Sequence, residues 1–402
     1  FNGEHPMSHA GLILGLPEVE VERVDRNDAI HVYARPKQRP CCIHCGHNRV
    51  RIKATYQRTL KHTRQGNQLI TLRLRTPKYH CKRCGRYFHH RFKGARPRFR
   101  ASETFRLEVF EAHDGGVTQA KLKRSHGISA ATVERWYRSF CQARVSEISN
   151  RPCPKVLGID EHFFSRKKGY ATTLVDLRRN KVFDVRLGRS EASLQCYLRH
   201  LPGKDNVELI VIDLSENYRS IARQYFPQAK IVADRFHVIR LVNQHFLNAW
   251  KEVDPEGRKN RGLISLMRRH EWHLPPDKHA NLQRYLSEHP GLHALYDAKQ
   301  KLTRLLLLKN LRKRRAQQKL PILLNLIEQL RQTPLRKLAK TVTSWLEPIL
   351  MMWRTNKSNG PTEGFHTKME MMSRRAYGFK NFGNYRMRVM THCGWDGIIN
   401  RV

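Results

Sequence analysis

The sequence predicts a multidomain protein, in which a metal-binding module and a small helical domain precede an α/β core that is interrupted by an all-helical insertion. Three observations predict this fold class. Two Cys-x-x-Cys-Gly motifs lie in the first hundred residues, strand and helix patterns alternate from residue 155 to 234, and only helical periodicity follows to about residue 353. The 402 residues allow about two to four domains.

The composition indicates an anionic partner. Lys and Arg number 76 against 34 Asp and Glu, which leaves a formal net charge of +42. Because no apolar run approaches about 18 residues and no signal peptide is visible, we expect a cytoplasmic protein without a membrane partner. The scattered remaining cysteines fit a reducing compartment. Phosphate backbone is the expected partner, with strongly salt-dependent binding.

The two cysteine motifs predict a zinc ribbon. In a Cys-x-x-Cys turn two thiolates reach one metal ion, and the following glycine takes a backbone angle that a Cβ resists. The predicted Zn²⁺ ligands are Cys42, Cys45, Cys81 and Cys84. Cys42 is preferred to Cys41 because only Cys42 has the x-x spacing to Cys45. Disulfide pairing and incidental free thiols are the alternatives, and two matched motifs disfavour both.

Residues 1–100 form the predicted ribbon domain, with a strand at residues 68–75 and a basic linker at residues 91–100. Residues 101–150 predict a helix-turn-helix domain, because a short helix is followed by Gly127 and by a second helix that Ser129 caps. An ordinary helical hairpin is the alternative. The DNA-binding candidates in this domain are Lys121, Lys123, Arg124 and Arg135.

The α/β core begins near residue 151, and its first part extends to about residue 250. Strands are expected at residues 156–160, 171–177, 181–187, 207–213 and 229–234, and helices at residues 191–201 and 216–226. Three strands followed by helix, strand, helix and strand is the order of an RNase H-like core. The continuous apolar runs suit strands that are buried on both faces.

An all-helical insertion is expected at residues 251–355, and residues 356–402 complete the core. The basic cluster at residues 309–315 suits either a solvated helix face or a DNA-facing one. The final helix starts at residues 358–361, where proline in the first turn favours helix initiation, and ends at Gly378. Its DNA-binding candidates are Lys368, Arg374 and Arg375.

Three aspartates, Asp160, Asp213 and Asp234, each follow an apolar run of the core. Carboxyl ends of parallel strands face the crevice in which open α/β sheets bind ligands. Burial of these charges is costly unless a cation compensates them, and Mg²⁺ or Mn²⁺ bound by carboxylates can promote in-line phosphoryl displacement. A strand-end aspartate that caps the next turn is the alternative for each one taken alone.

Topology selects among the carboxylates. In an RNase H-like sheet the fourth strand lies beside the first, so Asp213 is expected nearer to Asp160 than Asp234 is. We therefore predict Asp160, Asp213 and Glu363 as the catalytic set, with Glu370 a weaker alternative to Glu363. Asp234 and His237 form an Asp-x-x-His pattern that suits a supporting pair, although helix capping by Asp234 is also possible.

These motifs also carry a resemblance. Residues 158–161, 166–170, 233–238 and 358–364, together with the two cysteine motifs, resemble the bacterial insertion-sequence transposases of the ISL-three family. The resemblance implies a DDE transposase that binds terminal inverted repeats and target DNA, and that performs metal-dependent strand cleavage and strand transfer. It also implies a homodimer or a higher oligomer that is nucleoid-associated when bound to DNA.

Two other functions share parts of this pattern. A DNA-binding transcriptional regulator with an inactive RNase H-like core would have no physical need for unpaired buried carboxylates. An RNase H-like nuclease or resolvase would have less need for two sequence-reading modules. The sequence does not specify the terminal repeat, the target preference or the choice between copying and excision.

Overall fold

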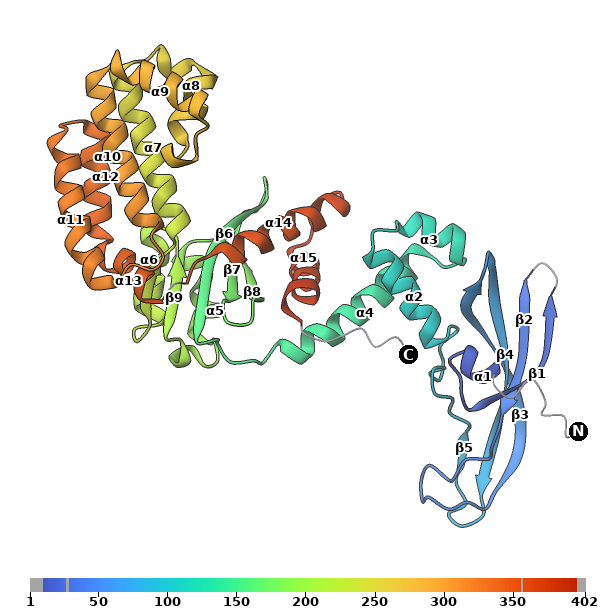
Figure 1. The fold of residues 1–402 in the computed structure, drawn as a ribbon. Coiled ribbons are helices and arrows are strands. Elements are labelled where there is room, and N and C mark those ends of the chain that lie inside the picture. Colours follow the sequence, from blue (N-terminus) through green and yellow to red (C-terminus); the bar gives the residue numbers. More distant parts are fainter. Residues whose placement is uncertain (1–9, 27–28, 356, 396–402) are drawn as a thin grey trace, which may run out of the picture. The chain divides into compact units, whose positions relative to one another are not determined.

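The computed structural model describes residues 10–26, 29–355 and 357–395 (Figure 1). Residues 1–6 lie outside this described part. The chain divides into two compact units, of which the first extends through Ala143 and the second begins at Arg144. Among the described residues, no helix combines the length and the apolar character that a membrane span requires.

The first unit is built on a five-stranded sheet of order β1-β2-β4-β3, with β5 paired to the last residues of β4. A short helix α1 (Ala10–Ile13) precedes the strands β1 (Val19–Arg26), β2 (Ile30–Pro36), β3 (Val50–Gln65), β4 (Gln68–Cys81) and β5 (Tyr87–His89). The strand expected at residues 68–75 is the first part of β4. β3 is not among the predicted strands, although Val50, Ile52, Ala54 and Tyr56 alternate with polar residues in its first half.

Residues 91–100 do not form the free linker that their composition predicts. Phe92 and Ala95 are buried in the core of the sheet, and Lys61 on β3 forms a parallel bridge with Ala101. Beside this bridge, His62 and Ser102 share a buried hydrogen bond of 2.7 Å. Basic composition alone indicates exposure, but backbone pairing to β3 holds this segment against the sheet.

Three helices follow, α2 (Glu103–Asp114), α3 (Gln119–His126) and α4 (Ala130–Ile148). Gly127 takes the left-handed conformation at the end of α3 with φ 59°. Ser129 accepts a hydrogen bond from the Thr132 N–H at 3.2 Å, as expected of a residue that caps α4. The helices enclose a small apolar core made by Phe105, Val109, Leu122, Val133 and Trp136, among others.

The second unit contains a five-stranded sheet of order β10-β9-β6-β7-β8. Its strands are β6 (Val156–Ser165), β7 (Gly169–Asp176), β8 (Lys181–Leu187), β9 (Leu209–Ile212) and β10 (Lys230–Ala233). The pairs β6–β7 and β7–β8 are antiparallel, whereas β6–β9 and β9–β10 are parallel. Every strand expected between residues 156 and 234 is present. Asp160 does not end its strand, however, because β6 continues to Ser165 through its pairing with β7.

The helices of the second unit include one group that connects the strands and another that forms the insertion (Figure 1). The connecting helices are α5 (Glu191–Arg199) and α6 (Glu216–Tyr225). The long α7 (Arg235–Val253) leads into α8 (Arg261–Arg268), α9 (Pro276–Ser287), α10 (Pro290–Leu307), α11 (Lys313–Gln329), α12 (Thr333–Ser344) and α13 (Leu346–Thr355). α14 (Gly360–Arg375) and α15 (Phe382–Val389) return to the sheet, where α14 packs on β6 and β7.

The basic cluster at residues 309–315 does not occupy a single helix face. It spans the turn after α10 and the first residues of α11. Lys313 in this cluster forms an ion pair with Glu347 of α13. At least one of its charges therefore contributes to the packing of the insertion.

A buried junction joins α14 to β6. Asn359, which is 2% exposed, donates its side-chain N–H to the Ile159 carbonyl at 3.1 Å. Its carbonyl oxygen accepts a hydrogen bond from the Thr362 hydroxyl at 3.0 Å. Gly158 permits this approach, because a Cβ there would lie 2.6 Å from Asn359 Oδ1. The start of α14 is thus positioned on the central strand of the sheet.

We predict that Gly158→Ala destabilises the second unit by about 1–3 kcal/mol, because Asn359 or the adjacent Leu177 must move to accommodate the methyl group. Thermal unfolding should show a lower midpoint. Gly364→Ala is the matched control, since a Cβ at that position of α14 meets no atom within 4 Å. An unchanged midpoint for Gly158→Ala would show that the junction tolerates the extra volume.

Candidate active site and metal centres

The three aspartates of the core lie in one row across adjacent parallel strands. Gly158 of β6 pairs with Val211 of β9, and Asp160 and Asp213 each lie two residues after this pair. Ile212 of β9 pairs with Ala233 of β10, and Asp213 and Asp234 each lie one residue after this pair. Since β9 lies between β6 and β10, Asp213 is on the strand next to that of Asp160, as the expected topology requires.

Asp160 is the most perturbed carboxyl of this row. The residue is 6% exposed, and its Oδ1 accepts a hydrogen bond of 2.8 Å from the Glu161 N–H. Burial raises the pKa of Asp160 to about 7, opposed by that hydrogen bond and by His237, and assisted by the nearby charges of Asp213 and Glu363. A buried carboxyl among like charges is an environment that a cation would stabilise.

Asp213 is partly buried and accepts a hydrogen bond from the Ser215 N–H at 3.2 Å. Burial raises its pKa, while the neighbouring His237 acts in the opposite direction. A tighter group consists of Asp160, Glu363 and His366, whose potential ligand atoms lie within 4.8 Å of one another and could hold a metal ion. Asp213 is close enough to influence Asp160 but lies outside that group.

Asp234 and His237 form a pair, with Nδ1 of His237 3.0 Å from Asp234 Oδ2. Oδ1 of Asp234 accepts a hydrogen bond from the Asn359 N–H at 2.9 Å. Burial acts to raise the pKa of Asp234, but these two hydrogen bonds outweigh it and leave the pKa lowered. The Asp234 side chain makes no capping hydrogen bond to α7, so both of its oxygens are directed to His237 and Asn359.

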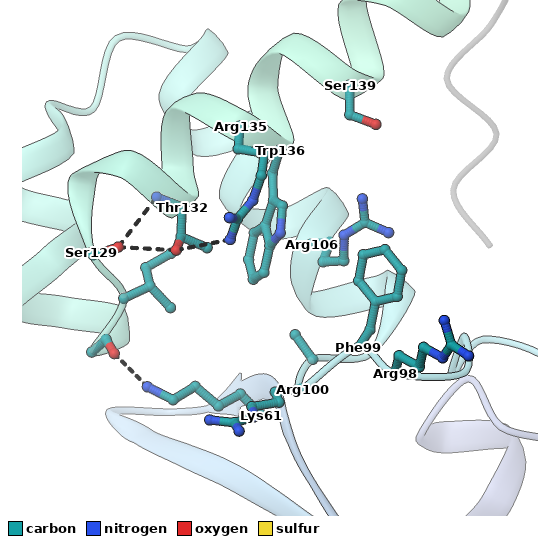
Figure 2. Close-up of a pocket in the computed structure, with 13 residues that line it drawn as sticks. Lys61, Arg98, Phe99, Arg100, Arg106, Ser129, Thr132, Arg135, Trp136 and Ser139 are labelled. Carbon is teal, nitrogen blue, oxygen red and sulfur yellow. Dashed lines mark hydrogen bonds between the residues drawn. The ribbon is translucent and has the colours of Figure 1, made fainter.

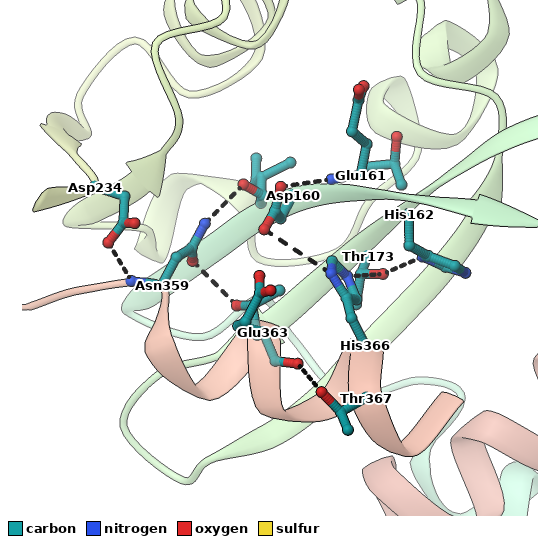
Figure 3. A network of polar contacts seen from close by, with 12 residues as sticks. Asp160, Glu161, His162, Thr173, Asp234, Asn359, Glu363, His366 and Thr367 are labelled. Atoms are coloured by element: carbon teal, nitrogen blue, oxygen red, sulfur yellow. Dashed lines mark hydrogen bonds and ion pairs between the residues drawn. The ribbon is translucent and has the colours of Figure 1, made fainter. Parts of the chain in front are cut away.

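The first turns of α14 bring two side chains to Asp160 (Figure 3). Glu363 is in the first turn and exposed, and His366 follows it three residues later on the same helix face. Nδ1 of His366 is 4.0 Å from Asp160 Oδ2. Glu370 pairs with Arg374 and is not a member of the group of three.

Neither His366 nor the junction formed by Asn359 is among the residues predicted from the sequence. The spacing of three residues between Glu363 and His366 on a predicted helix was a usable signal for the first. No comparable signal identifies Asn359, because its partners on β6 and after β10 lie more than a hundred residues away along the chain.

The four predicted cysteines form one cluster that could hold a metal ion. The Sγ atoms of Cys42 and Cys84 are 3.7 Å apart, and those of Cys45 and Cys81 are 3.6 Å apart. Four sulfurs around one Zn²⁺ at about 2.3 Å would be separated by roughly 3.8 Å. The exposed Cys41 is not part of the cluster. The glycine of each motif, Gly46 with φ 72° and Gly85 with φ 68°, takes the positive φ angle that the turn requires.

A basic pocket of about 700 Å³ lies between residues 98–101 and the turn before α4 (Figure 2). Its cationic residues are Lys61, Arg98, Arg100, Arg106 and Arg135. Lys61 donates to the Gly127 carbonyl, and Arg106 pairs with Glu103 and lies over the Phe99 and Trp136 rings. Within the described residues, Arg98, Arg100 and Arg135 form no ion pair, so their charges are available to an anion.

The other DNA-binding candidates are also accessible. Lys121, Lys123 and Arg124 are exposed on α3, and Lys368, Arg374 and Arg375 are exposed on α14. Arg374 is less available to a phosphate than the others, because it forms an ion pair with Glu370. Each helix therefore presents basic side chains to solvent, as expected of surfaces that contact phosphates.

Residues 157–389, which contain both the sheet and the helical insertion, match the model of a family described as transposase. The chain belongs to the ISL-three family of transposases. Over 235 residues it is 24% identical to the transposase for insertion sequence element IS1001 of Bordetella parapertussis. That alignment covers 56% of this chain and 57% of the Bordetella transposase, so the chain spans just over half the length of this curated relative. The family match confirms the resemblance seen in the sequence motifs.

We predict that the purified transposase contains one zinc ion per chain, and that Cys81→Ser abolishes its retention, because loss of one thiolate opens the four-sulfur site. Zinc can be measured by elemental analysis. Cys41→Ser is the matched control and should retain the ion, since Cys41 is outside the cluster. Zinc loss in Cys41→Ser with retention in a Cys42→Ser variant would reassign the first ligand.

We predict that Asp160→Asn stabilises the protein when no divalent ion is added beyond its bound zinc. The folded-state pKa of about 7 exceeds the unfolded value, so folding binds a proton and the stability contribution of Asp160 falls as pH rises from about 4 to 7. The variant should gain about 4 kcal/mol at pH 8 and roughly 1.5 kcal/mol at pH 5. Unfolding midpoints at both pH values measure this, and an equal gain at each would contradict it.

Proposed function

We propose that this transposase binds the terminal inverted repeats of an insertion sequence and performs metal-dependent DNA cleavage and strand transfer. The observation that carries the proposal is the row of Asp160, Asp213 and Asp234 with Glu363 brought to it by α14. A row of buried and partly buried carboxylates across parallel strands, beside a helix that adds another, suits phosphoryl-transfer chemistry.

The donor set fits Mg²⁺ or Mn²⁺. Asp160, Asp213 and Glu363 offer hard carboxylate oxygens, and burial disfavours the charged forms of both aspartates in the absence of a cation. In our proposal these three residues hold the metal. When bound, the metal would stabilise charge on the attacking and leaving oxygens of an in-line displacement.

Asp234 and His237 are proposed as a supporting pair. Their mutual hydrogen bond holds the imidazole beside Asp160 and Asp213, and the His237 pKa is raised chiefly by its bond to Asp234. Asp234 also receives the backbone N–H of Asn359 at the start of α14. The pair thus positions the helix that carries Glu363, and His237 offers a positive charge to DNA or to the metal-binding groups.

We further propose that the core is RNase H-like and that the domains follow the expected order. A strand order in which an antiparallel trio is extended by two parallel strands supports this core. The proposed parts are a zinc ribbon at residues 1–100, a helix-turn-helix at 101–150, the core at 151–250 and 356–402, and the insertion at 251–355. The reaction would take place in the bacterial cytoplasm, at the nucleoid.

DNA recognition is assigned to the zinc ribbon and the helix-turn-helix, with further phosphate contacts from α14. Arg98, Arg100 and Arg135 line one pocket and form no ion pair within the described part of the chain, which supports a contact with the backbone of the repeat. Target DNA would contact the core. Cleavage at two element ends requires two active sites held together, so a homodimer or a higher oligomer is proposed.

Incubation of the protein with candidate element ends and Mg²⁺ or Mn²⁺ tests this function. Nicked and joined strands are expected. Specific binding without any strand product would instead favour a transcriptional regulator with an inactive core. Hydrolysis without joining would favour an RNase H-like nuclease or resolvase.

We predict that Asp213→Ala abolishes both cleavage and strand transfer while leaving DNA affinity unchanged, because it removes a metal ligand that lies far from the DNA-reading modules in sequence. Asp234→Ala should reduce activity less completely and lower thermal stability, since Asp234 holds the start of α14. Strand products and DNA affinity are measured in parallel. Asp205→Ala is the control, because Asp205 is exposed and outside the carboxylate row.

Near-normal cleavage by Asp213→Ala, together with none by a folded Asp234→Ala variant, would reverse these roles. Asp234 would then be the second metal-binding aspartate. The unfolding midpoint of each variant separates a loss of chemistry from a loss of structure.

A further inference from the structure

A line of hydrogen bonds leads from Tyr385 on α15 to His366, which faces Asp160. The Tyr385 hydroxyl lies 2.7 Å from His162 Nε2, and His162 Nδ1 lies 3.0 Å from Thr173 Oγ1. The same hydroxyl of Thr173 lies 3.0 Å from His366 Nε2. Nδ1 of His366 then faces Asp160 Oδ2 at 4.0 Å (Figure 3). Each member is a neutral group that can both donate and accept, so one fixed end sets the direction of the rest.

Tyr385 is the fixed end. It is 3% exposed, and the rings of Phe164, Phe379 and Phe382 surround it with centroids 5.0, 5.3 and 6.0 Å from its own. Among the described residues, His162 is the only hydrogen-bond partner of its hydroxyl. If the hydroxyl accepted from His162, its own proton would be buried without an acceptor, which is costly. The Tyr385 hydroxyl therefore donates to His162 Nε2.

The direction of every later bond follows from this one. Because Nε2 of His162 accepts, the ring carries its proton on Nδ1 and donates to Thr173 Oγ1. Thr173, which is fully buried, must then donate its own proton to His366 Nε2. An accepting Nε2 leaves the proton of the His366 ring on Nδ1, the atom that faces Asp160.

We propose that Tyr385 holds His366 as the Nδ1–H tautomer, so that His366 is a hydrogen-bond donor in the active site and not a nitrogen ligand of the metal. His366 lies near enough to Asp160 and Glu363 to be taken for a third ligand. A protonated Nδ1 has no lone pair to offer a metal, and the metal is left with oxygen donors. The catalytic meaning of this assignment rests on the proposed function, but the tautomer itself does not.

The geometry also indicates what the donor binds. The distance of 4.0 Å from Nδ1 to Asp160 Oδ2 exceeds a hydrogen bond, so the proton is not bound by Asp160 and is available to an oxygen that approaches from the side. In a site that cleaves DNA, this oxygen is a non-bridging oxygen of the scissile phosphate. Because buried hydrogen bonds hold this donor in place, it can stabilise negative charge on that oxygen without first reorganising. Tyr385, His162 and Thr173 are positioning residues in this assignment.

Nitrogen NMR of the full-length, zinc-loaded protein with ¹⁵N-labelled histidine tests the tautomer directly. The His366 signals are assigned by their loss in His366→Gln. We expect a protonated Nδ1 and an unprotonated Nε2 in the native protein, and a mixture of tautomers in Tyr385→Phe, which lacks the donor. Tyr377→Phe is the control, because Tyr377 is 92% exposed and outside the relay. A native His366 protonated on Nε2 would overturn the proposal.

Metal selectivity gives a second readout that needs no DNA. Loss of a nitrogen ligand lowers affinity for Mn²⁺ more than for Ca²⁺, because Ca²⁺ prefers oxygen donors. We expect His366→Gln to leave the ratio of Mn²⁺ to Ca²⁺ affinity within about twofold of the native ratio, and Tyr385→Phe to shift it toward Mn²⁺ by exposing the Nδ1 lone pair. A tenfold or larger fall of the ratio in His366→Gln would make His366 a ligand and refute the proposal. Protein that shows the expected tautomer and ratio but cuts no DNA would contradict only the proposed function.

Discussion

The geometry of the carboxylate site depends on the buried junction at Asn359. Its side chain bonds the backbone of β6, and its backbone N–H bonds Asp234 at the end of β10. Both contacts fall at the residue that precedes α14, so the helix carrying Glu363 and His366 is placed by the strands that carry the aspartates. Gly158 makes room for this contact on β6. Because the junction is buried and its polar groups are paired, displacement of α14 would leave unsatisfied polar groups in the core.

The negative charges that would bind a cation at this site also lower the stability of the fold when no cation is bound. Burial raises the pKa values of Asp160 and Asp213, so their ionised forms weaken the fold unless a cation is present. Asp234 has the opposite behaviour, since its hydrogen bonds to His237 and Asn359 favour the charged form. Three aspartates in one row thus have different environments. That difference fits a division between metal binding and support.

The fold and much of the site could be predicted from local pattern. Apolar runs identified every strand of the core, and the cysteine spacing identified all four members of the sulfur cluster, because both signals act over a few neighbouring residues. Asp213, Asp234 and Glu363 were marked by their positions at strand and helix ends, and Asp160 by the apolar run before it. The strands β1, β2 and β3 were not predicted, although alternating apolar residues mark each of them, as Ile30, Val32 and Ala34 do in β2.

The sequence by itself therefore determined the order of the elements in the α/β core, the four cysteines that cluster and the carboxylates that lie in one row. Only the tertiary structure decided that residues 91–100 pack against β3, that Asn359 joins three segments, and that His366 faces Asp160. The physical reason is the range of the interactions. A hydrogen bond between Asn359 and Ile159 or between His366 and Thr173 closes about two hundred residues of chain, and no local pattern records such a contact.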